Sequence, residues 1–286
     1  MANFTRRAIK EAFTSLLEER PLNDITVKDI VERCGINRNS FYYHYQDLPA
    51  LIEEIIKEDA ESIIQAYPSV SVIRGDGTLF WNRGMRKAWE DALKKNADFY
   101  LWLNDDTVLY PSALVHLLEA SRQMEHLAVI CGSTCGPGTD EWTYGGMSGG
   151  KPVIPDGTLQ ECALCHGNIL WVPRHVVDRI GILDGFYLHA LGDYDYSRTA
   201  HSCGIPLRVA PSFLGTCAWH DKAVPWTDRE VPLIRRLRNL YSPLGNAQPR
   251  YYFHYVRKHE GLPAACRAMV CMHVRVFFPA LWTKTK

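Results

Sequence analysis

Apolar positions in the first quarter of the chain recur with the period of an α-helix. A stripe at three- and four-residue spacing predicts a first helix with one buried face. The stripe comprises Ala8, Ile9, Ala12, Phe13, Leu16 and Leu17. Pro21 and Asn23 end this predicted helix. Apolar residues with helical spacing occur again later in this part of the chain. The helix that they predict ends before Pro68, because proline disfavours helix in the residue that precedes it.

Two shorter helices are expected between these limits. Thr26, with Asp29 three residues further on, has the arrangement of a capping box and opens the first of them. Gly35 closes it, because glycine adopts a left-handed C-cap conformation without steric cost. Asn37 or Arg38 opens the second, which is rich in hydrogen-bonding side chains. Two short helices joined by a glycine turn are typical of a helix-turn-helix.

Beyond this helical quarter the pattern changes. Val70, Val72 and Ile73 alternate with other residues and predict a short strand, and a helix is expected from about residue 82 to 93. Residues 99–103 form a continuous apolar run, short enough for a buried parallel strand. Strand, helix and strand in this order predict an α/β sheet.

Polar side chains follow this apolar run directly. Asn104, Asp105 and Asp106 come after it, and open α/β sheets bind their ligands at the carboxyl ends of parallel strands. Paired oxygen ligands at such a place suit Mg²⁺ or Mn²⁺ bridging a diphosphate. A solvated loop is the alternative, because two adjacent aspartates after a strand are by themselves a weak motif.

Composition is that of a globular protein with room for one large domain or two ordinary ones. The chain has 286 residues, of which 47% are hydrophobic and 22% charged. Its 32 basic and 32 acidic residues balance, but residues 1–70 hold 8 Lys and Arg against 12 Asp and Glu. Neither part has a polybasic arm, so any contact with nucleic acid must come from a local patch.

Cysteine spacing and hydropathy restrict the expected compartment. Nine cysteines are too few and too irregularly spaced for a disulfide framework, and the N-terminal segment has no apolar signal stretch, so a cytoplasmic protein with reduced thiols is expected. Cys162 and Cys165, followed by His166, have a spacing found in metal sites; buried thiols are the other interpretation, since no second pair lies at zinc-ribbon distance. No apolar run reaches the length of about eighteen residues that predicts a membrane span.

The last apolar segment, residues 262–282, carries Arg267, His273 and Arg275 among apolar and aromatic side chains. Two interpretations are open. An amphipathic helix of this kind can lie in a membrane interface, which would place the protein peripherally at the inner membrane face. Packing of the helix onto the preceding domain is the alternative.

Residues 26–45, continued by Asp47, Ala50 and Leu51, carry a longer pattern, TVKDIVERCGINRNSFYYHY. This pattern resembles the tetracycline-repressor (TetR) family of transcriptional regulators. The resemblance implies double-stranded DNA as partner, with base edges contacted by Arg38, Asn39, Ser40 and Tyr43 and phosphates held by Thr26, Tyr42 and His44. The pattern departs from the family at Leu48, where a lysine commonly opens the fourth helix. An ordinary small helical bundle is the alternative.

Separated segments of the remaining chain form a second pattern. They are residues 74–85 with Ala88 and Trp89, residues 101–107, residues 166–173, and residues 191–196 with Arg198. Their order and spacing resemble inverting family 2 glycosyltransferases of the GT-A fold, from about residue 70 to the C-terminus. The resemblance implies transfer of a sugar from a nucleotide-sugar donor to a glycan or lipid-linked acceptor, with Mg²⁺ or Mn²⁺ as cofactor.

The same resemblance assigns roles to individual residues. Asp193 would be the general base that deprotonates the acceptor hydroxyl, and Asp195 would orient that base or the acceptor. The metal and diphosphate ligands would be Asn104, Asp105 and Asp106, of which the first has an amide where the family's Asp-x-Asp motif has a carboxylate. His220 would supply a further metal ligand, or be a hydrogen-bonded structural histidine.

The second pattern lacks the family's two opening strand-helix units, which hold the nucleoside. We therefore expect a TetR-like helical domain at residues 1–68 and, at residues 70–286, an incomplete GT-A-like α/β domain with a C-terminal helical extension. Unpaired strand edges predict oligomerisation. TetR-family proteins dimerise through a C-terminal helical domain, for which this sequence offers no counterpart. The functional hypotheses are DNA binding, glycosyl transfer with the helices as an appendage, and a chimera with neither activity.

Overall fold

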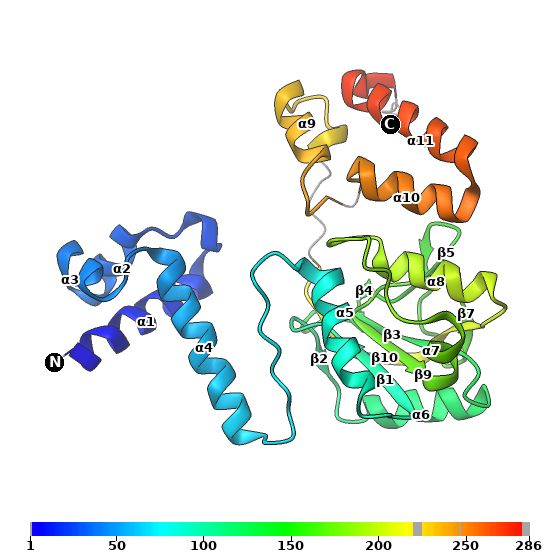
Figure 1. Cartoon of the computed structure of the whole chain (residues 1–286), viewed down its shortest axis with the longest axis horizontal. Coiled ribbons are helices and arrows are strands. Elements are labelled where there is room, and N and C mark those ends of the chain that lie inside the picture. The colour runs from blue at the N-terminus through cyan, green and yellow to red at the C-terminus, as the bar shows by residue number, and fades with distance from the viewer. Residues whose placement is uncertain (1, 220–224, 246, 282–286) are drawn as a thin grey trace. The chain divides into compact units, whose positions relative to one another are not determined.

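The structure, a computed structural model, describes residues 2–219, 225–245 and 247–281. The chain divides into two compact units, Met1–Arg74 and Gly75–Lys286. Figure 1 shows that the first is built of helices alone, whereas the second combines a sheet with helices. Each unit is described by itself.

Unit 1 is a helical bundle around one apolar core. Its helices are α1 (Ala2–Glu19), α2 (Val27–Cys34), α3 (Arg38–His44) and α4 (Leu48–Ala66), with a 3-10 turn at Leu22–Asp24. The predicted stripe of α1 is confirmed: Ile9, Ala12, Phe13 and Leu16 are at most 5% exposed, although Leu17 at the edge of the stripe is 41% exposed. They pack with Ile30 and Val31 of α2, Phe41 of α3, and Leu51 of α4.

The ends of these helices are fixed by local side chains, as the sequence predicts. Thr26 and Asp29 form a capping box at the start of α2, and Gly35 ends that helix in the left-handed region at φ 68°. Asn37 caps α3 by accepting from the backbone of Ser40. Asp47 caps α4 in the same way, with Pro49 in the first turn, where proline is tolerated. The helix-turn-helix geometry is therefore encoded within a few residues of each turn.

Unit 2 has a mixed sheet with the strand order β1-β9-β3-β10-β2. These strands are β1 (Phe99–Leu103), β2 (Val108–Leu109), β3 (Val129–Cys135), β9 (Ile169–Pro173) and β10 (Leu207–Thr216). Two short strands extend the sheet: β4 (Trp142–Tyr144) pairs with β3, and β7 (Gln160–Glu161) pairs with β10. A second small sheet contains β5 (Gly146–Ser148), β6 (Lys151–Pro152) and β8 (Leu164–Cys165).

Helices cover both faces of the larger sheet. Helices α5 (Phe80–Leu93), α7 (Arg174–Ile180) and α8 (Gly192–Ser202) bury Trp89, Val176 and Tyr196 against one face, where Trp102, Leu170 and Val209 meet them. On the other face α6 (Ala113–Gln123) buries Leu117 against Ile130 and Leu214. A sheet buried on both sides explains why its strands read as continuous apolar runs.

The remaining helices follow the sheet in sequence. They are α9 (Leu233–Leu240), α10 (Pro249–Glu260) and α11 (Leu262–Phe277), with 3-10 turns at Pro225–Thr227 and Pro279–Leu281. Tyr255 and Val256 of α10 pack with Tyr187 and Leu191 beside α8, whereas Leu240 of α9 packs with Met272 and Val276 of α11. No helix in the described part of the chain is long and apolar enough to cross a membrane.

Two predictions about residues 70–103 are wrong; the first concerns the end of unit 1 and the second concerns unit 2. Residues 70–73 form no strand, and Val70, Val72 and Ile73 are 37–45% exposed, because their alternation finds no apolar surface to pack against. The apolar run at 99–103 is a strand, but it pairs antiparallel with β9 and lies at the edge of the sheet. The pattern predicted a strand correctly but not its full burial, since Tyr100 and Trp102 are buried whereas Leu103 is 39% exposed. Apolar runs also do not distinguish strand directions.

The edge strand β1 is open on one side. Asn104 donates its backbone N–H to the Asn168 carbonyl and Arg174 donates to the Asp98 carbonyl, so even-numbered residues face β9. The backbone groups of Phe99, Leu101 and Leu103 therefore point away from β9, where no described strand pairs with them. An apolar cavity of about 360 Å³ lies along this strand, lined by side chains of α5 and β1.

Candidate functional site

Helix α3 presents one exposed face made of residues predicted to contact DNA. Arg38, Asn39, Tyr42 and Tyr43 are exposed, the two tyrosines by 53% and 82%. Their spacing of i, i+1, i+4 and i+5 puts them on the same side of the helix. Guanidinium, amide and phenol groups on one exposed helix face can hydrogen-bond to base edges or phosphates.

The remaining predicted DNA contacts lie at helix starts, where they already have partners. The Ser40 hydroxyl donates to the Asn37 carboxamide oxygen over 3.1 Å and is half-buried. The Thr26 hydroxyl donates to the Asp29 carboxylate over 2.6 Å. His44 is half-buried in the last turn of α3, with its ring 5.0 Å from that of Tyr43. Thr26 and Ser40 thus stabilise the starts of their helices. To contact DNA, each hydroxyl would have to hydrogen-bond to the nucleic acid as well as to its present partner.

Buried residues on the opposite side anchor α3. Phe41 is fully buried and Tyr45 is 3% exposed. The Tyr45 hydroxyl donates to the Glu54 carboxylate over 3.1 Å, and Lys10 donates to Glu54 and Glu58 over 2.6 Å each. Burial, together with the charge of Glu54, raises the pKa of Tyr45 to about 12. This network ties α1 to α4 and was missed in the sequence, because its members lie up to 48 residues apart.

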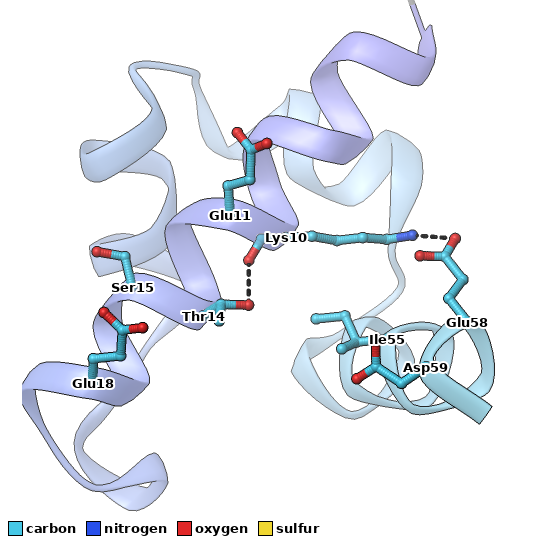
Figure 2. Close-up of a pocket in the computed structure, with 8 residues that line it drawn as sticks. All are labelled: Lys10, Glu11, Thr14, Ser15, Glu18, Ile55, Glu58 and Asp59. Atoms are coloured by element: carbon cyan, nitrogen blue, oxygen red, sulfur yellow. Dashed lines mark hydrogen bonds and ion pairs between the residues drawn. The ribbon is translucent and has the colours of Figure 1, made fainter. Parts of the chain in front are cut away.

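Acidic charge in unit 1 collects on elements other than α3. Figure 2 shows a groove between α1 and α4, with Lys10 reaching across it to Glu58. The groove has a volume of about 400 Å³, and its lining includes Glu11, Glu18 and Asp59. Because a carboxylate-lined surface repels phosphates, this groove is unsuited to DNA. The net acidity of unit 1 is therefore compatible with a DNA-binding face at α3.

In unit 2, Trp81 links two residues that the sequence singled out separately. Its indole N–H donates to the Asn104 carboxamide oxygen over 2.8 Å. The same ring packs on Gly167, where a Cβ atom would lie 2.5 Å from it, so only glycine fits. The Gly167 backbone N–H in turn donates to the Asp193 carboxylate over 3.2 Å. Asn104 is therefore linked to Asp193 through Trp81 and Gly167, although 89 residues separate the two polar residues in the chain.

Asp193 sits at the start of α8 in a setting that favours its protonated form. Its carboxylate also accepts from the Tyr194 backbone N–H over 2.9 Å. Desolvation by burial raises the pKa of Asp193, against the lowering effect of His166 and of the backbone donors. A carboxylate of raised pKa is a stronger proton acceptor, as a general base requires.

Aromatic rings surround His166 beside this carboxylate. The Tyr194 hydroxyl lies 2.9 Å from His166 Nε2, and the Gly145 carbonyl oxygen lies 2.9 Å from Nδ1. Both ring nitrogens of His166 thus lie within hydrogen-bond distance of a partner. The rings of Trp142 and Tyr144 lie 5.9 and 5.5 Å from the imidazole, centroid to centroid, and both also contact Trp219, which is 50% exposed. No motif marked these aromatics, because they come from separate strands and loops.

The predicted metal ligands are only partly brought together. Asp105 and Asp106 are exposed in the turn after β1, whereas the Asn104 carboxamide oxygen is engaged by Trp81. Within residues 2–219, 225–245 and 247–281, no three His, Cys, Asp or Glu side chains gather to hold a metal ion. His220 lies outside the described residues. The carboxylates of Asp105 and Asp106 are thus the oxygen donors at this turn. They could bind a cation only if phosphates or water supplied the remaining ligands.

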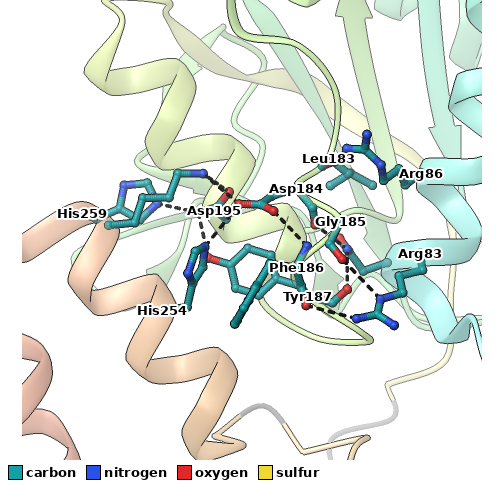
Figure 3. A network of polar contacts seen from close by, with 12 residues as sticks. Arg83, Arg86, Leu183, Asp184, Gly185, Phe186, Tyr187, Asp195, His254 and His259 are labelled. Atoms are coloured by element: carbon teal, nitrogen blue, oxygen red, sulfur yellow. Dashed lines mark hydrogen bonds and ion pairs between the residues drawn. The ribbon is translucent and has the colours of Figure 1, made fainter.

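Asp195 points into a different network from Asp193. It is 2% exposed and accepts hydrogen bonds from the Tyr187 hydroxyl at 2.9 Å, Lys258 at 2.7 Å and His259 at 2.8 Å. Figure 3 shows these groups converging from α8, α10 and the segment before α8. Burial and the neighbouring Asp195 charge raise the pKa of Tyr187. With both oxygens engaged, Asp195 ties α10 to α8 and positions the start of α8.

The same segment is held from its other side by α5. Asn82 donates to the carbonyl oxygens of Asp184 and Tyr187 over 2.9 and 3.0 Å, and Arg83 donates to that of Gly185 over 3.3 Å. These contacts are visible in part in Figure 3. Asp184 meanwhile faces Lys258 at 3.5 Å. The loop before α8 is thus held by contacts from α5 on one side and α10 on the other. These contacts fix the position of the backbone that carries Asp193.

Cys162 and Cys165 are buried thiols in this structure. Their sulfurs are 3.7 Å apart. The hydrogen bond between them and their burial raise the pKa of Cys162. No metal-binding group forms around them in the described part of the chain. Protonated, buried thiols of this kind are inert packing groups.

Comparison with known proteins identifies the first unit. Residues 9–55 match the family described as bacterial regulatory proteins, tetR family. A protein of Bacillus subtilis (strain 168), described as an uncharacterized HTH-type transcriptional regulator YxbF, is 36% identical over 58 residues, which are 20% of this chain. The chain spans 15% of the length of this curated relative. Residues 9–55 are thus a TetR-type helix-turn-helix domain, followed in the chain by a mixed helix and sheet region.

Proposed function

We propose that this protein binds double-stranded DNA in a sequence-dependent manner through helix α3. The observation that carries the proposal is the exposed face of Arg38, Asn39, Tyr42 and Tyr43 on a helix whose other side is anchored by Phe41. A helix of about this diameter fits the major groove of B-DNA. The similarity of residues 9–55 to TetR regulators supports the same assignment.

The contacts divide into two classes. Arg38, Asn39 and Tyr43 would read base edges, together with Ser40 where its hydroxyl is shared with Asn37. Tyr42, His44 and Thr26 would hold phosphates and so fix the register of the helix in the groove. No lysine is available at Leu48, so the phosphate contribution is expected to be modest and the salt dependence of binding shallow.

Selection from randomised duplexes at low salt tests this proposal. We expect enrichment of one sequence family, and gel shifts in which Arg38→Ala weakens binding to that family by about five- to a hundredfold. Lys57→Ala is the matched control, because it removes an exposed positive charge from α4 and should leave binding nearly unchanged. Failure to shift any duplex at low salt would contradict the proposal.

We propose, as a second function, that unit 2 is a glycosyltransferase-like module that retains the acceptor side of the site. The observation that favours it is the chain of contacts from Asn104 through Trp81 and Gly167 to Asp193, since the resemblance assigns Asn104 and Asp193 to one centre. In such a module the Asp193 carboxylate would take the proton of an acceptor hydroxyl as that oxygen attacks the sugar. A divalent cation at Asp105 and Asp106 would stabilise the leaving diphosphate when bound.

The donor side limits what this module is expected to do. Strand β1 is the edge of the sheet, and no described strand lies beyond it to carry nucleobase contacts. We therefore expect weak binding of Mn²⁺ with a nucleoside diphosphate and no base selectivity. We also expect no detectable turnover of a nucleotide sugar.

Calorimetry with Mn²⁺ and a series of nucleoside diphosphates tests this second proposal. Weak binding should be lost in Asp106→Ala and kept in Asp178→Ala, which removes an exposed carboxylate from α7. Micromolar binding of one nucleotide over the others would contradict the absence of a nucleobase site. Equal binding by both variants would contradict the assignment of the cation to this turn.

A further inference from the structure

Helix α11 has a buried face and an opposite apolar face that remains exposed. Ala265, Met272 and Val276 are at most 6% exposed and face the rest of unit 2, where Met272 and Val276 pack with Leu240. Other sides of the helix carry exposed side chains up to residue 271, whereas residues 273–275 are half-buried. The exposed side chains include Leu262 (54%), Cys266, Val270 (63%) and Cys271, and Phe277 (48%) and Phe278 (60%) are exposed again at the end of the helix. An exposed apolar stripe of this length on a folded helix is typical of an interaction surface.

A second exposed apolar patch lies on α9, which packs with α11 through the same small core. Leu233 is 38% exposed and Ile234 is 75% exposed at the start of α9. Packing within unit 2 thus uses only one side of each helix. The two apolar patches belong to one helical region of unit 2.

Positive charge accompanies these apolar side chains. Helices α9 and α11 together hold five arginines and no Asp or Glu, although Arg236 is buried. Arg235 and Arg238 of α9 and Arg267 of α11 are exposed, and Arg267 stands on the apolar side of α11 itself. A second copy of this region would bring like charges together. An anionic surface complements both the charge and the apolar stripe.

We propose that α9 and α11 form a docking surface for an anionic lipid bilayer, independent of DNA binding and of any transferase activity. The helices would lie in the plane of the interface, with Leu262, Val270 and Phe277 among the acyl chains and the arginines at the phosphates. Insertion across the bilayer is not involved, because α11 has 16 residues and a span needs about 20.

Two native cysteines lie on the proposed surface and report its occupancy. Cys266 and Cys271 are exposed on α11, whereas Cys34 is half-buried in unit 1. We expect phosphatidylcholine vesicles containing phosphatidylglycerol to slow maleimide labelling of Cys266 by about tenfold or more, as burial in the interface implies, and to leave Cys34 unchanged. Pure phosphatidylcholine vesicles should protect much less. Protection that depends on protein concentration without vesicles would assign the surface to self-association and overturn the proposal.

Matched variants test the same surface by vesicle flotation. Val270→Asp places a charge on the apolar stripe and should abolish flotation with anionic vesicles. Val115→Asp is the control, because Val115 is equally exposed (64%) on α6, outside the region. Arg267→Glu should reduce flotation severalfold on anionic vesicles only. Flotation of Val270→Asp at the wild-type level, or equal loss in Val115→Asp, would overturn the proposal; circular dichroism checks that each variant is folded.

Discussion

The helical unit and the sheet unit satisfy their backbone hydrogen bonds over very different distances. In unit 1 the cap of each short helix is supplied three residues away, as Thr26 and Asp29 show. In unit 2 strand β1 depends on β9, some seventy residues later, and its other edge stays open. Because its helix ends are capped by nearby residues, unit 1 can present the same surface whatever sequence adjoins it. An open sheet needs partners from elsewhere in the chain or from another molecule.

The largest expected effect concerns the long-range contacts of unit 2. Asp195→Ala removes a carboxylate that is 2% exposed and leaves Lys258 and His259 without their common partner. We expect a loss of about 3–5 kcal/mol in the unfolding free energy of unit 2. All eight tryptophans lie in this unit, so tryptophan fluorescence during denaturation follows it alone. The control Asp178→Ala, at an exposed position, should change the unfolding free energy by less than about 0.5 kcal/mol. If Asp195→Ala lowered the unfolding free energy equally little, the stability of α10 would not depend on this network.

A smaller effect is expected at the open edge of the sheet. The unpaired backbone groups of Phe99, Leu101 and Leu103 favour strand addition by a second molecule. Leu103→Lys, at a position 39% exposed, should therefore reduce self-association severalfold in sedimentation velocity, because an edge lysine opposes pairing. Val115→Lys on α6 controls for the added charge. A monodisperse wild-type chain would rule out this edge as an association site.

The smallest effect concerns the local contacts of unit 1. Hydrogen bonds from Thr26, with a further contribution from Arg20, lower the pKa of Asp29 from 3.8 to about 2. The folded state therefore favours the carboxylate, and its stabilising contribution is complete above pH 3.8 and is lost as the pH falls towards 2. Hydrogen exchange of the α2 amides should accelerate over this range, and Asp29→Asn should remove that part of the pH dependence. The control Asp59→Asn on α4 should keep that pH dependence. If hydrogen exchange depended on pH in the same way in the wild-type protein and both variants, the capping box would contribute nothing to it.

Sequence patterns predicted the first unit almost completely and the second only in outline. The α1 stripe, the Thr26 cap and the Gly35 turn depend on neighbours in the chain, so their patterns are sufficient. At the end of unit 1 the predicted strand at residues 70–73 is absent, because alternation signals a strand only where a sheet offers a place for it. In unit 2 the apolar run at residues 99–103 is a strand, but it is antiparallel and lies at the edge of the sheet.

The candidate site in unit 2 also shows how far sequence patterns can predict contacts. The link from Asn104 to Asp193 depends on Trp81 and Gly167, and the pattern that contains these residues does not say that they contact each other. The partners of Asp195 come from α10, more than sixty residues later in the chain. No spacing rule connects such positions, because the contact is created by the fold.

Base preference of the Asn39→Ala variant tests most directly whether the exposed face of α3 reads DNA. Wild-type protein and variant would each be selected against randomised duplexes, and the enriched sequences compared position by position. We expect Asn39→Ala to lose preference at one or two adjacent base pairs, by about five- to a hundredfold, and to keep the others. Tyr42→Ala, which removes a proposed phosphate contact, should instead weaken binding to all sequences alike. An unchanged preference in Asn39→Ala, or no preference in the wild-type protein, would show that the exposed face of α3 does not read base sequence.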